Sequence, residues 1–323
     1  MTAITRRNLG VLALFVASGA HAQAPATGPV RITSVFPTGS GPDSVARLVG
    51  EKLQAKWQRP VVVDTKPGGA GMVAINTVKG ATPNGSELVL LDVGNLSINP
   101  LIFKTLSYDP EKDLVPVSVL YKTAFVIVVS AEGPYKSLKD LIAAAGDKSR
   151  KLSFGSNAVG GPLHLHSERL ARALGSDMIH VPFKEISQLY ASVSTGEVNW
   201  AFGSLASTGP LVRAGRLRVL AIADAARSPV VPDVPTLAEA GGPKDLQATS
   251  WVALMAPRGT TLAVAADINR AVNDALAQPD LLEKLANFGF ASGAGPVQQV
   301  TDLMRADRAR YAEVVKHLNI SVD

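Results

Sequence analysis

Three glycine-rich turns are the parts of this chain best suited to chemistry. They lie at 37–41, 66–71 and 155–161, each directly before the start of a predicted helix. A helix start presents unpaired backbone N–H groups and about half a unit of positive charge, and glycine lets a ligand approach the backbone closely. One such turn is ordinary in a strand-to-helix connection. Three of them at comparable strand ends favour a shared anion site, outside the carboxyl ends of the strands.

Metal and cofactor chemistry is poorly supported by the residues present. The chain has no cysteine, which excludes disulfides, thiolate metal sites and a cysteine nucleophile. His164 and His166 would point to different faces of the helix predicted there, so we do not expect them to share a metal ion. The first turn lacks the third glycine of a dinucleotide fingerprint, and no Gly-Lys-Ser/Thr motif occurs. We therefore expect no metal and no cofactor.

A periplasmic serine hydrolase is the enzymatic alternative to an anion-binding protein. Ser156 or Ser40 could be a nucleophile exposed on a turn. However, the residues around Ser156 do not form a G-x-S-x-G motif, and no histidine is placed by the sequence to serve this serine. We therefore expect a binding protein rather than an enzyme.

The elements that must position these turns alternate between strand and helix. The predicted strands lie at 30–36, 61–63, 88–91 and 152–154. Helices are expected to begin near Pro42, after Gly71 and near Pro162, where a proline suits the first helical position. The first of these helices carries apolar residues on one face, namely Val45, Leu48, Val49 and Leu53. This alternation predicts an α/β protein with mostly parallel sheets flanked by helices.

Two apolar stretches contain no turn signal and are long enough to run from one sheet into another. They lie at 118–130 and 251–255, and we interpret them as two hinge strands. The predicted domains are therefore 23–124 plus 252–323, with 125–251 inserted between them as the second domain. The segment 296–318 has apolar residues at mostly helical spacing, which predicts a closing amphipathic helix.

Length and composition agree with this organisation. The 323 residues suit two domains of ordinary size, and 46% hydrophobic with 18% charged residues permits a buried core. Aromatic residues make up only 5%, which counts against binding of single-stranded nucleic acid. The net charge of +5 is not concentrated in any block of like charges, so it would attract anions only modestly.

The first 22 residues have the three regions of a secretory signal peptide. Arg6 and Arg7 precede an apolar run at 9–17, and Ala20 and Ala22 form an A-x-A cleavage site. The run is too short for a membrane anchor. We expect residues 1–22 to be removed and the mature protein to reach the periplasm by the Sec or the twin-arginine route.

Short stretches along nearly the whole mature chain resemble the receptors of tripartite tricarboxylate transporters, the Bug family of solute-binding proteins. Each stretch alone is a weak signal, but all of them occur in order. The resembling stretches lie at 37–47, 66–71, 97–100, 108–113, 180–184, 215–221, 232–236, 239–241, 250–251 and 256–257.

The resemblance implies a two-domain clamshell of the periplasmic-binding-protein kind, a Venus flytrap. In that family a small carboxylate is held between the domains, largely by main-chain amides, and is delivered to membrane permease subunits. It implies a monomer with no nucleic-acid partner. An adaptor for a periplasmic sensor is the alternative role. The implied ligand-binding residues are Thr38, Gly39, Ser40, Gly41, Gly68, Gly69, Ala70, Gly71, Ser156, Asn157, Gly160, Gly161, Phe202, Gly203 and Ser204.

Several positions depart from the family pattern. Pro42 replaces a hydroxyl residue and has no N–H group to donate. Met72 stands where a polar residue is common, and Gly203 stands where an aspartate is frequent. These losses of polar groups predict a ligand that is larger or less polar than citrate.

Overall fold

The computed structural model describes residues 28–322, so the predicted signal peptide lies outside the described residues. The strands are β1 (Val30–Ser34), β2 (Val61–Thr65), β3 (Glu87–Asp92), β4 (Leu114–Ser130), β5 (Ser153–Ser156), β6 (Ile179–Pro182), β7 (Trp200–Ser204), β8 (Leu217–Ile222), β9 (Thr249–Pro257) and β10 (Phe290–Ser292). The α-helices are α1 (Gly41–Trp57), α2 (Met72–Val78), α3 (Asn99–Ile102), α4 (Leu138–Gly146), α5 (Pro162–Ala173), α6 (Ile186–Thr195), α7 (Leu205–Arg213), α8 (Leu262–Leu276), α9 (Pro279–Asn287) and α10 (Gln298–Leu318). Two short helical turns complete the elements, η1 (Gly69–Gly71) and the π-helical η2 (Gly94–Ile98).

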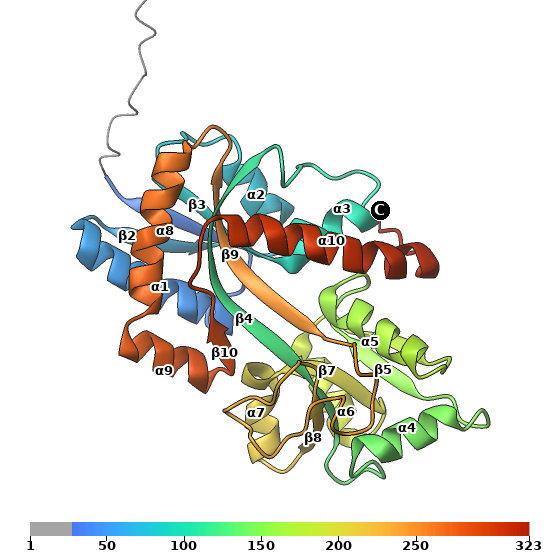
Figure 1. The fold of residues 1–323 in the computed structure, drawn as a ribbon. Helices are drawn as coiled ribbons and strands as arrows, with labels where there is room; N and C mark the ends of the chain where they lie inside the picture. Colours follow the sequence, from blue (N-terminus) through green and yellow to red (C-terminus); the bar gives the residue numbers. More distant parts are fainter. Residues whose placement is uncertain (1–27, 323) are drawn as a thin grey trace, which may run out of the picture.

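The first sheet has the strand order β2-β1-β3-β9-β4, with β10 paired to the other edge of β4. Strands β1, β2 and β3 are parallel, whereas β9 is antiparallel to both β3 and β4. Helices α1, α8 and α9 pack on one hydrophobic core of this sheet, and α2, η2, α3 and α10 pack on another. We call this sheet and its helices the first lobe (Figure 1).

The second sheet has the order β8-β4-β7-β5-β6. Strands β5, β6 and β7 are parallel to one another, and both β7 and β8 are antiparallel to β4. Residues of β4 to β8 and of α4 to α6 form one apolar core here. We call this sheet and its helices the second lobe.

Strand β4 joins the two lobes, and the long green arrow in Figure 1 runs through both of them. Its pairing with β9 ends at Ala124, and its pairing with β7 begins at Phe125. The fold class expected from the sequence is therefore confirmed, with antiparallel pairing confined to the strands at the hinge and at β10. The domain boundaries themselves stay a prediction.

The helix α1 shows how the sequence positions a turn. Ser40 caps its start, Pro42 occupies its first turn, and Gln58 ends it in a left-handed conformation. The apolar face expected from the sequence packs in the first lobe, with Val45, Val49 and Leu53 fully buried. The turn at 37–41 is thereby held at the carboxyl end of β1. Across residues 28–322, no helix is both long and apolar enough to cross a bilayer.

Candidate functional site

The predicted site residues fall at the carboxyl ends of four strands. We keep the names first turn (37–41), second turn (66–71) and third turn (155–161), which follow β1, β2 and β5, and add the β7 end (202–204). Within each lobe the strands that carry them are parallel, so their carboxyl ends meet at one edge of the sheet. In open α/β sheets, ligands bind outside this edge.

The first turn is held by its own side chains. Ser40 Oγ accepts from the Asp43 N–H group at 3.4 Å, and Asp43 Oδ2 accepts from the Gly39 N–H group at 2.8 Å. The same carboxylate oxygen lies 3.0 Å from Arg47 Nε. The Gly39 N–H group is therefore not free for a ligand, and the Asp43 charge already complements the positive end of α1.

The second turn keeps the donors that the first turn lacks. Gly68, Gly69, Ala70 and Gly71 all have positive φ, at 101°, 54°, 51° and 86°. The Gly71 N–H group donates to Gly68 O at 3.0 Å, whereas the N–H groups of Gly69 and Ala70 have no acceptor among residues 28–322. Both residues are exposed, so two adjacent N–H groups are free to meet an anion.

The third turn is ordered by two stacked histidines. His164 Nδ1 accepts from the Gly160 N–H group at 3.0 Å, and His180 Nε2 lies 2.8 Å from Ser156 Oγ. The two imidazole centroids are 3.8 Å apart. Burial, with a smaller contribution from His164, lowers the pKa of His180 to about 4. Gly161 caps α5 without a side-chain bond, and Asn157 is exposed.

The Ser156–His180 pair is one that the sequence did not reveal. The two residues are 24 positions apart and meet only because β5 and β6 are paired. Ser156 is fully buried and its hydroxyl also donates to Ala158 O at 3.1 Å. In the described part of the chain no carboxylate bonds to His180. The pair therefore lacks both the access and the third group of a hydrolase triad.

The β7 end contributes a helix cap rather than side chains for a ligand. Ser204 caps α7, and its Oγ accepts from the Ser207 N–H group at 3.1 Å. Phe202 is fully buried beside Trp200. A Cβ at Gly203 would overlap Thr208 and Tyr190. The side chains of Phe202 and Ser204 are thus used in packing and in capping α7.

Close contacts connect the first and second turns. Thr38 Oγ1 lies 3.1 Å from Thr65 Oγ1 at the end of β2. A Cβ added at Gly71 would lie 3.2 Å from Val35 Cγ1, at the end of β1. The two turns therefore form one continuous part of the first lobe.

Two segments of the second lobe contact the first lobe, namely the third turn and the residue that follows the β7 end. A Cβ at Gly160 in the third turn would lie 2.7 Å from Ile102 Cδ1 in α3. On the other side, a Cβ at Gly289, next to β10, would lie 2.7 Å from Leu205 Cβ, which follows the β7 end. The aromatic ring of Phe290 in turn lies against Gly41 of the first turn. The third turn and the segment that follows the β7 end therefore both contact the first lobe.

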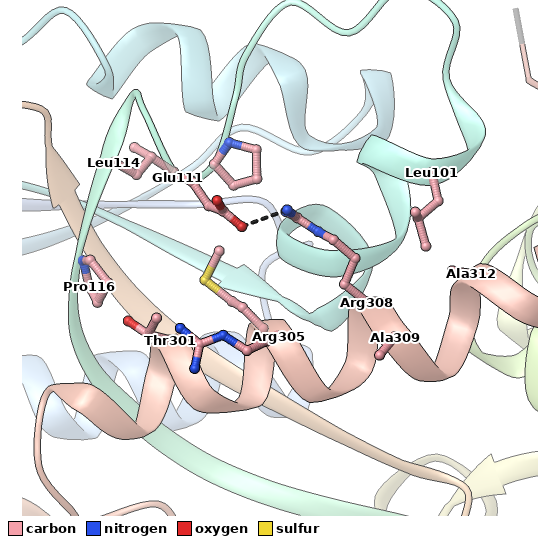
Figure 2. A pocket seen from close by; sticks show the side chains of 11 residues that line it. Leu101, Glu111, Leu114, Pro116, Thr301, Arg305, Arg308, Ala309 and Ala312 are labelled. Atoms are coloured by element: carbon pink, nitrogen blue, oxygen red, sulfur yellow. Dashed lines mark hydrogen bonds and ion pairs between the residues drawn. The ribbon is translucent and has the colours of Figure 1, made fainter.

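Two sizeable cavities lie away from these turns. One of about 700 Å³ lies on the first lobe between α10, the start of β4 and α3, where Arg308 points across to Glu111 (Figure 2). Another of about 480 Å³ lies at the hinge, between β10, α10 and the segment that follows β8. None of the predicted site residues lines either cavity.

Sequence reasoning missed a polar cluster behind the second turn. Asn95 Nδ2 and Asn99 Nδ2 both donate to Ala70 O at 2.9 Å. Tyr108 contacts both asparagines, and Asp92 Oδ1 accepts from the Asn95 N–H group. Burial raises the pKa of Asp92. The four-residue spacing of the asparagines, on one side of a helical turn, is the signal that could have indicated the cluster.

Metal binding finds no support in the described part of the chain. Within residues 28–322, no group of three or more histidine, aspartate or glutamate side chains is arranged to hold an ion. His164 and His166 point into different surroundings, since His166 contacts Tyr311 in α10 at 2.9 Å.

Comparison with known proteins gives a consistent result. The family model described as "Tripartite tricarboxylate transporter family receptor" matches residues 45–320. Protein BugT of Bordetella pertussis is 31% identical over 321 residues, covering 96% of this chain and 97% of BugT. A solved R. palustris protein with adipate is 30% identical, with a TM-score of 0.82 and coverage of 91% and 98% of the two chains.

A second solved structure, MatC from Rhodopseudomonas palustris with bound malate, is 28% identical. Its TM-score is 0.76, and the match covers 90% of this chain and 99% of MatC. The family consists of receptors rather than enzymes, and the resemblance noted in the sequence is confirmed. This chain belongs to the tripartite tricarboxylate transporter receptor family, the Bug proteins.

Proposed function

We propose that this protein is a periplasmic receptor that captures a small dicarboxylate between its two lobes and delivers it to the permease subunits of a tripartite tricarboxylate transporter. The observation that carries the proposal is that two adjacent exposed residues, Gly69 and Ala70, have N–H groups with no acceptor among residues 28–322. They lie in a turn that follows β2 in the first lobe, and contacts connect this turn to the first turn. Two adjacent backbone N–H groups can bind a carboxylate without any charged side chain.

The second lobe offers complementary groups for the other end of the ligand. Helices α5 and α7 begin at the third turn and at Ser204, and the first turn of a helix favours negative charge. A ligand held by both lobes stabilises the closed arrangement by its differential affinity for it. Closure would then report to the permease that the receptor is occupied. The proposed function involves no covalent step.

Relatives narrow the class of ligand. The two solved family members described above were obtained with adipate and malate, both of which are dicarboxylates. Compared with the family pattern, this chain has fewer polar groups near the proposed site, at Met72, Pro42 and Gly203. We therefore propose a dicarboxylate with an apolar middle as the ligand, and expect citrate to bind more weakly.

Calorimetric titration of the mature protein tests the proposal. Adipate, malate, citrate and acetate would be titrated at one pH and one ionic strength. We expect saturable binding of at least one dicarboxylate, with a rise in melting temperature because the ligand binds only the folded state. Acetate is the control with a single carboxylate. Failure of both adipate and malate to bind, or tighter binding of citrate than of either, would contradict the proposal.

A further inference from the structure

Asn95, Asn99 and Tyr108 form a buried cluster directly behind the second turn, and we call it the asparagine clamp. Their exposed fractions are 7%, 6% and 4%. Both asparagine Nδ2 atoms lie 2.9 Å from one acceptor, Ala70 O. A carbonyl can only accept, so the amide nitrogens, not the amide oxygens, must face it. Buried donors thus converge on the backbone of an exposed residue.

Tyr108 holds the two asparagines in place. Its hydroxyl donates to Asn95 O at 2.7 Å and accepts from Asn99 Nδ2 at 3.0 Å. Asn99 Nδ2 therefore uses both of its protons, one on Ala70 and one on Tyr108. At the other end, Asn95 Oδ1 accepts from the Asp92 N–H group at 3.3 Å. Both asparagine Nδ2 groups that face the second turn are thus bonded to its backbone.

The helical turn that carries the clamp is unusual. Gly94–Ile98 is a π-helix, in which the Asn99 N–H group bonds to Gly94 O. Single π-helical turns are rare and occur frequently at functional sites. Here the widened turn, followed by α3, directs the side chains of Asn95 and Asn99 onto the same carbonyl.

Ala70 has a backbone conformation that it would not adopt unaided. Its φ of 51° and ψ of 33° lie in the left-handed region, which is unfavourable for a residue with a Cβ. In this conformation the Ala70 carbonyl accepts from both asparagines of the clamp. The same conformation leaves the Gly69 and Ala70 N–H groups exposed and unpaired in the described part of the chain.

We propose that the asparagine clamp is a positioning device that fixes Ala70 in the left-handed conformation and so presents the Gly69 and Ala70 N–H groups to a ligand carboxylate. The inference rests on the proposed function, because it assigns a role within that site. Asn95 and Asn99 are positioning residues, since their side chains are buried and act on the backbone of the turn.

The clamp leaves little room for adjustment. A Cβ added at Gly71 would overlap the Nδ2 atom of Asn95. The glycine therefore allows the asparagine to reach beneath the turn. A backbone that already has its binding conformation loses less conformational freedom on binding than one that must adopt this conformation when the ligand arrives.

A double-mutant cycle tests the clamp: a second substitution, at Ala70, should restore the adipate affinity that is lost when Asn99 is replaced. Asn99→Ala removes one bond to Ala70 and is expected to weaken adipate binding about tenfold, the size of one lost hydrogen bond. Ala70→Gly removes the cost of positive φ, so the double variant Ala70→Gly/Asn99→Ala is expected to bind within about threefold of wild type. Additive losses, or an Asn99→Ala variant that binds as wild type, would overturn the proposal.

Controls separate positioning from general destabilisation. Asn76→Ala in α2 removes a bond to Ser107 Oγ on the same lobe and is expected to leave affinity unchanged. Tyr108→Phe weakens the clamp without removing an asparagine, and we expect it to lose affinity for adipate two- to fivefold. This variant replaces Asn99→Ala in the test if Asn99→Ala fails to fold. Unchanged affinity in Tyr108→Phe would then overturn the proposal.

The titration of the wild-type protein distinguishes failure of the proposed function from failure of the asparagine clamp. If wild type binds neither adipate nor malate, the proposed function fails and the clamp fails with it. If wild type binds and the cycle shows no rescue, the clamp alone is wrong. Melting temperatures of all variants, measured without ligand, show whether affinity and stability change separately.

Discussion

At the scale of single residues, the second turn depends on glycines whose replacement by any other residue would cost conformational free energy. Gly71 has a φ of 86°, which disfavours any side chain, and it also lies against the Asn95 amide. Gly196 at the end of α6 has nearly the same φ, 83°, but nothing near a would-be Cβ. The two positions therefore separate the conformational cost of a side chain from its steric cost.

We expect Gly196→Ala to destabilise the protein by about 1 kcal/mol through backbone conformation alone. Gly71→Ala adds the displacement of Asn95, so about 2–4 kcal/mol is expected. It should also weaken adipate binding, whereas Gly196→Ala should not. Urea unfolding and calorimetry measure both quantities. Equal destabilisation by the two variants would show that the clamp does not pack closely against the turn.

At the scale of elements, the contact between α5 and α10 holds the lobes together near the hinge. His166 in α5 lies 2.9 Å from Tyr311 OH in α10, and its Nε2 lies 3.2 Å from Thr249 O at the start of β9. Burial, and more weakly Arg169, lower the pKa of His166 to about 3. The imidazole is therefore neutral in the folded protein throughout the usual pH range.

This depressed pKa makes stability depend on pH. In the unfolded chain the pKa of a histidine is near 6.5, so the unfolded state binds a proton below that pH. In the folded state His166 binds this proton only near pH 3. Stability must therefore fall as the pH falls through this window. Between pH 7 and pH 5 the expected loss from His166 is about 2 kcal/mol.

Replacing the histidine isolates its contribution. His166→Gln should lose about 2 kcal/mol less than wild type between pH 7 and pH 5 in urea unfolding. Burial raises the pKa of the neighbouring Asp307, which acts in the opposite direction, but this carboxyl is present in both proteins. The exposed His317→Gln serves as control. Identical pH profiles for wild type and His166→Gln would contradict the assignment.

Elements were more predictable from the sequence than contacts. Apolar periodicity and the prolines in the first turns of α1 and α5 place these helices well, because such signals act within a few residues. The pairing of Ser156 with His180 and of Ala70 with Asn95 could not be predicted. It depends on strand register and on a π-helical turn that bring together residues 24 or 25 positions apart.

At the scale of the whole molecule, the turns that carry the proposed site belong to different lobes, which are joined through β4, β9 and close contacts between the lobes. The third turn meets the first lobe at Ile102, and the start of α7 meets it at Gly289. A ligand that spans the interface must therefore affect the arrangement of the lobes. The cavities on α10 and at the hinge lie outside this path and offer the ligand an alternative position.

A crystal structure of the mature protein grown with adipate would locate the ligand directly. One carboxylate is expected within about 3 Å of the Gly69 and Ala70 nitrogens, with the rest of the molecule in contact with the third turn or Ser204. Adipate seated in the hinge cavity or in the α10 cavity, with the second turn bare, would contradict the account.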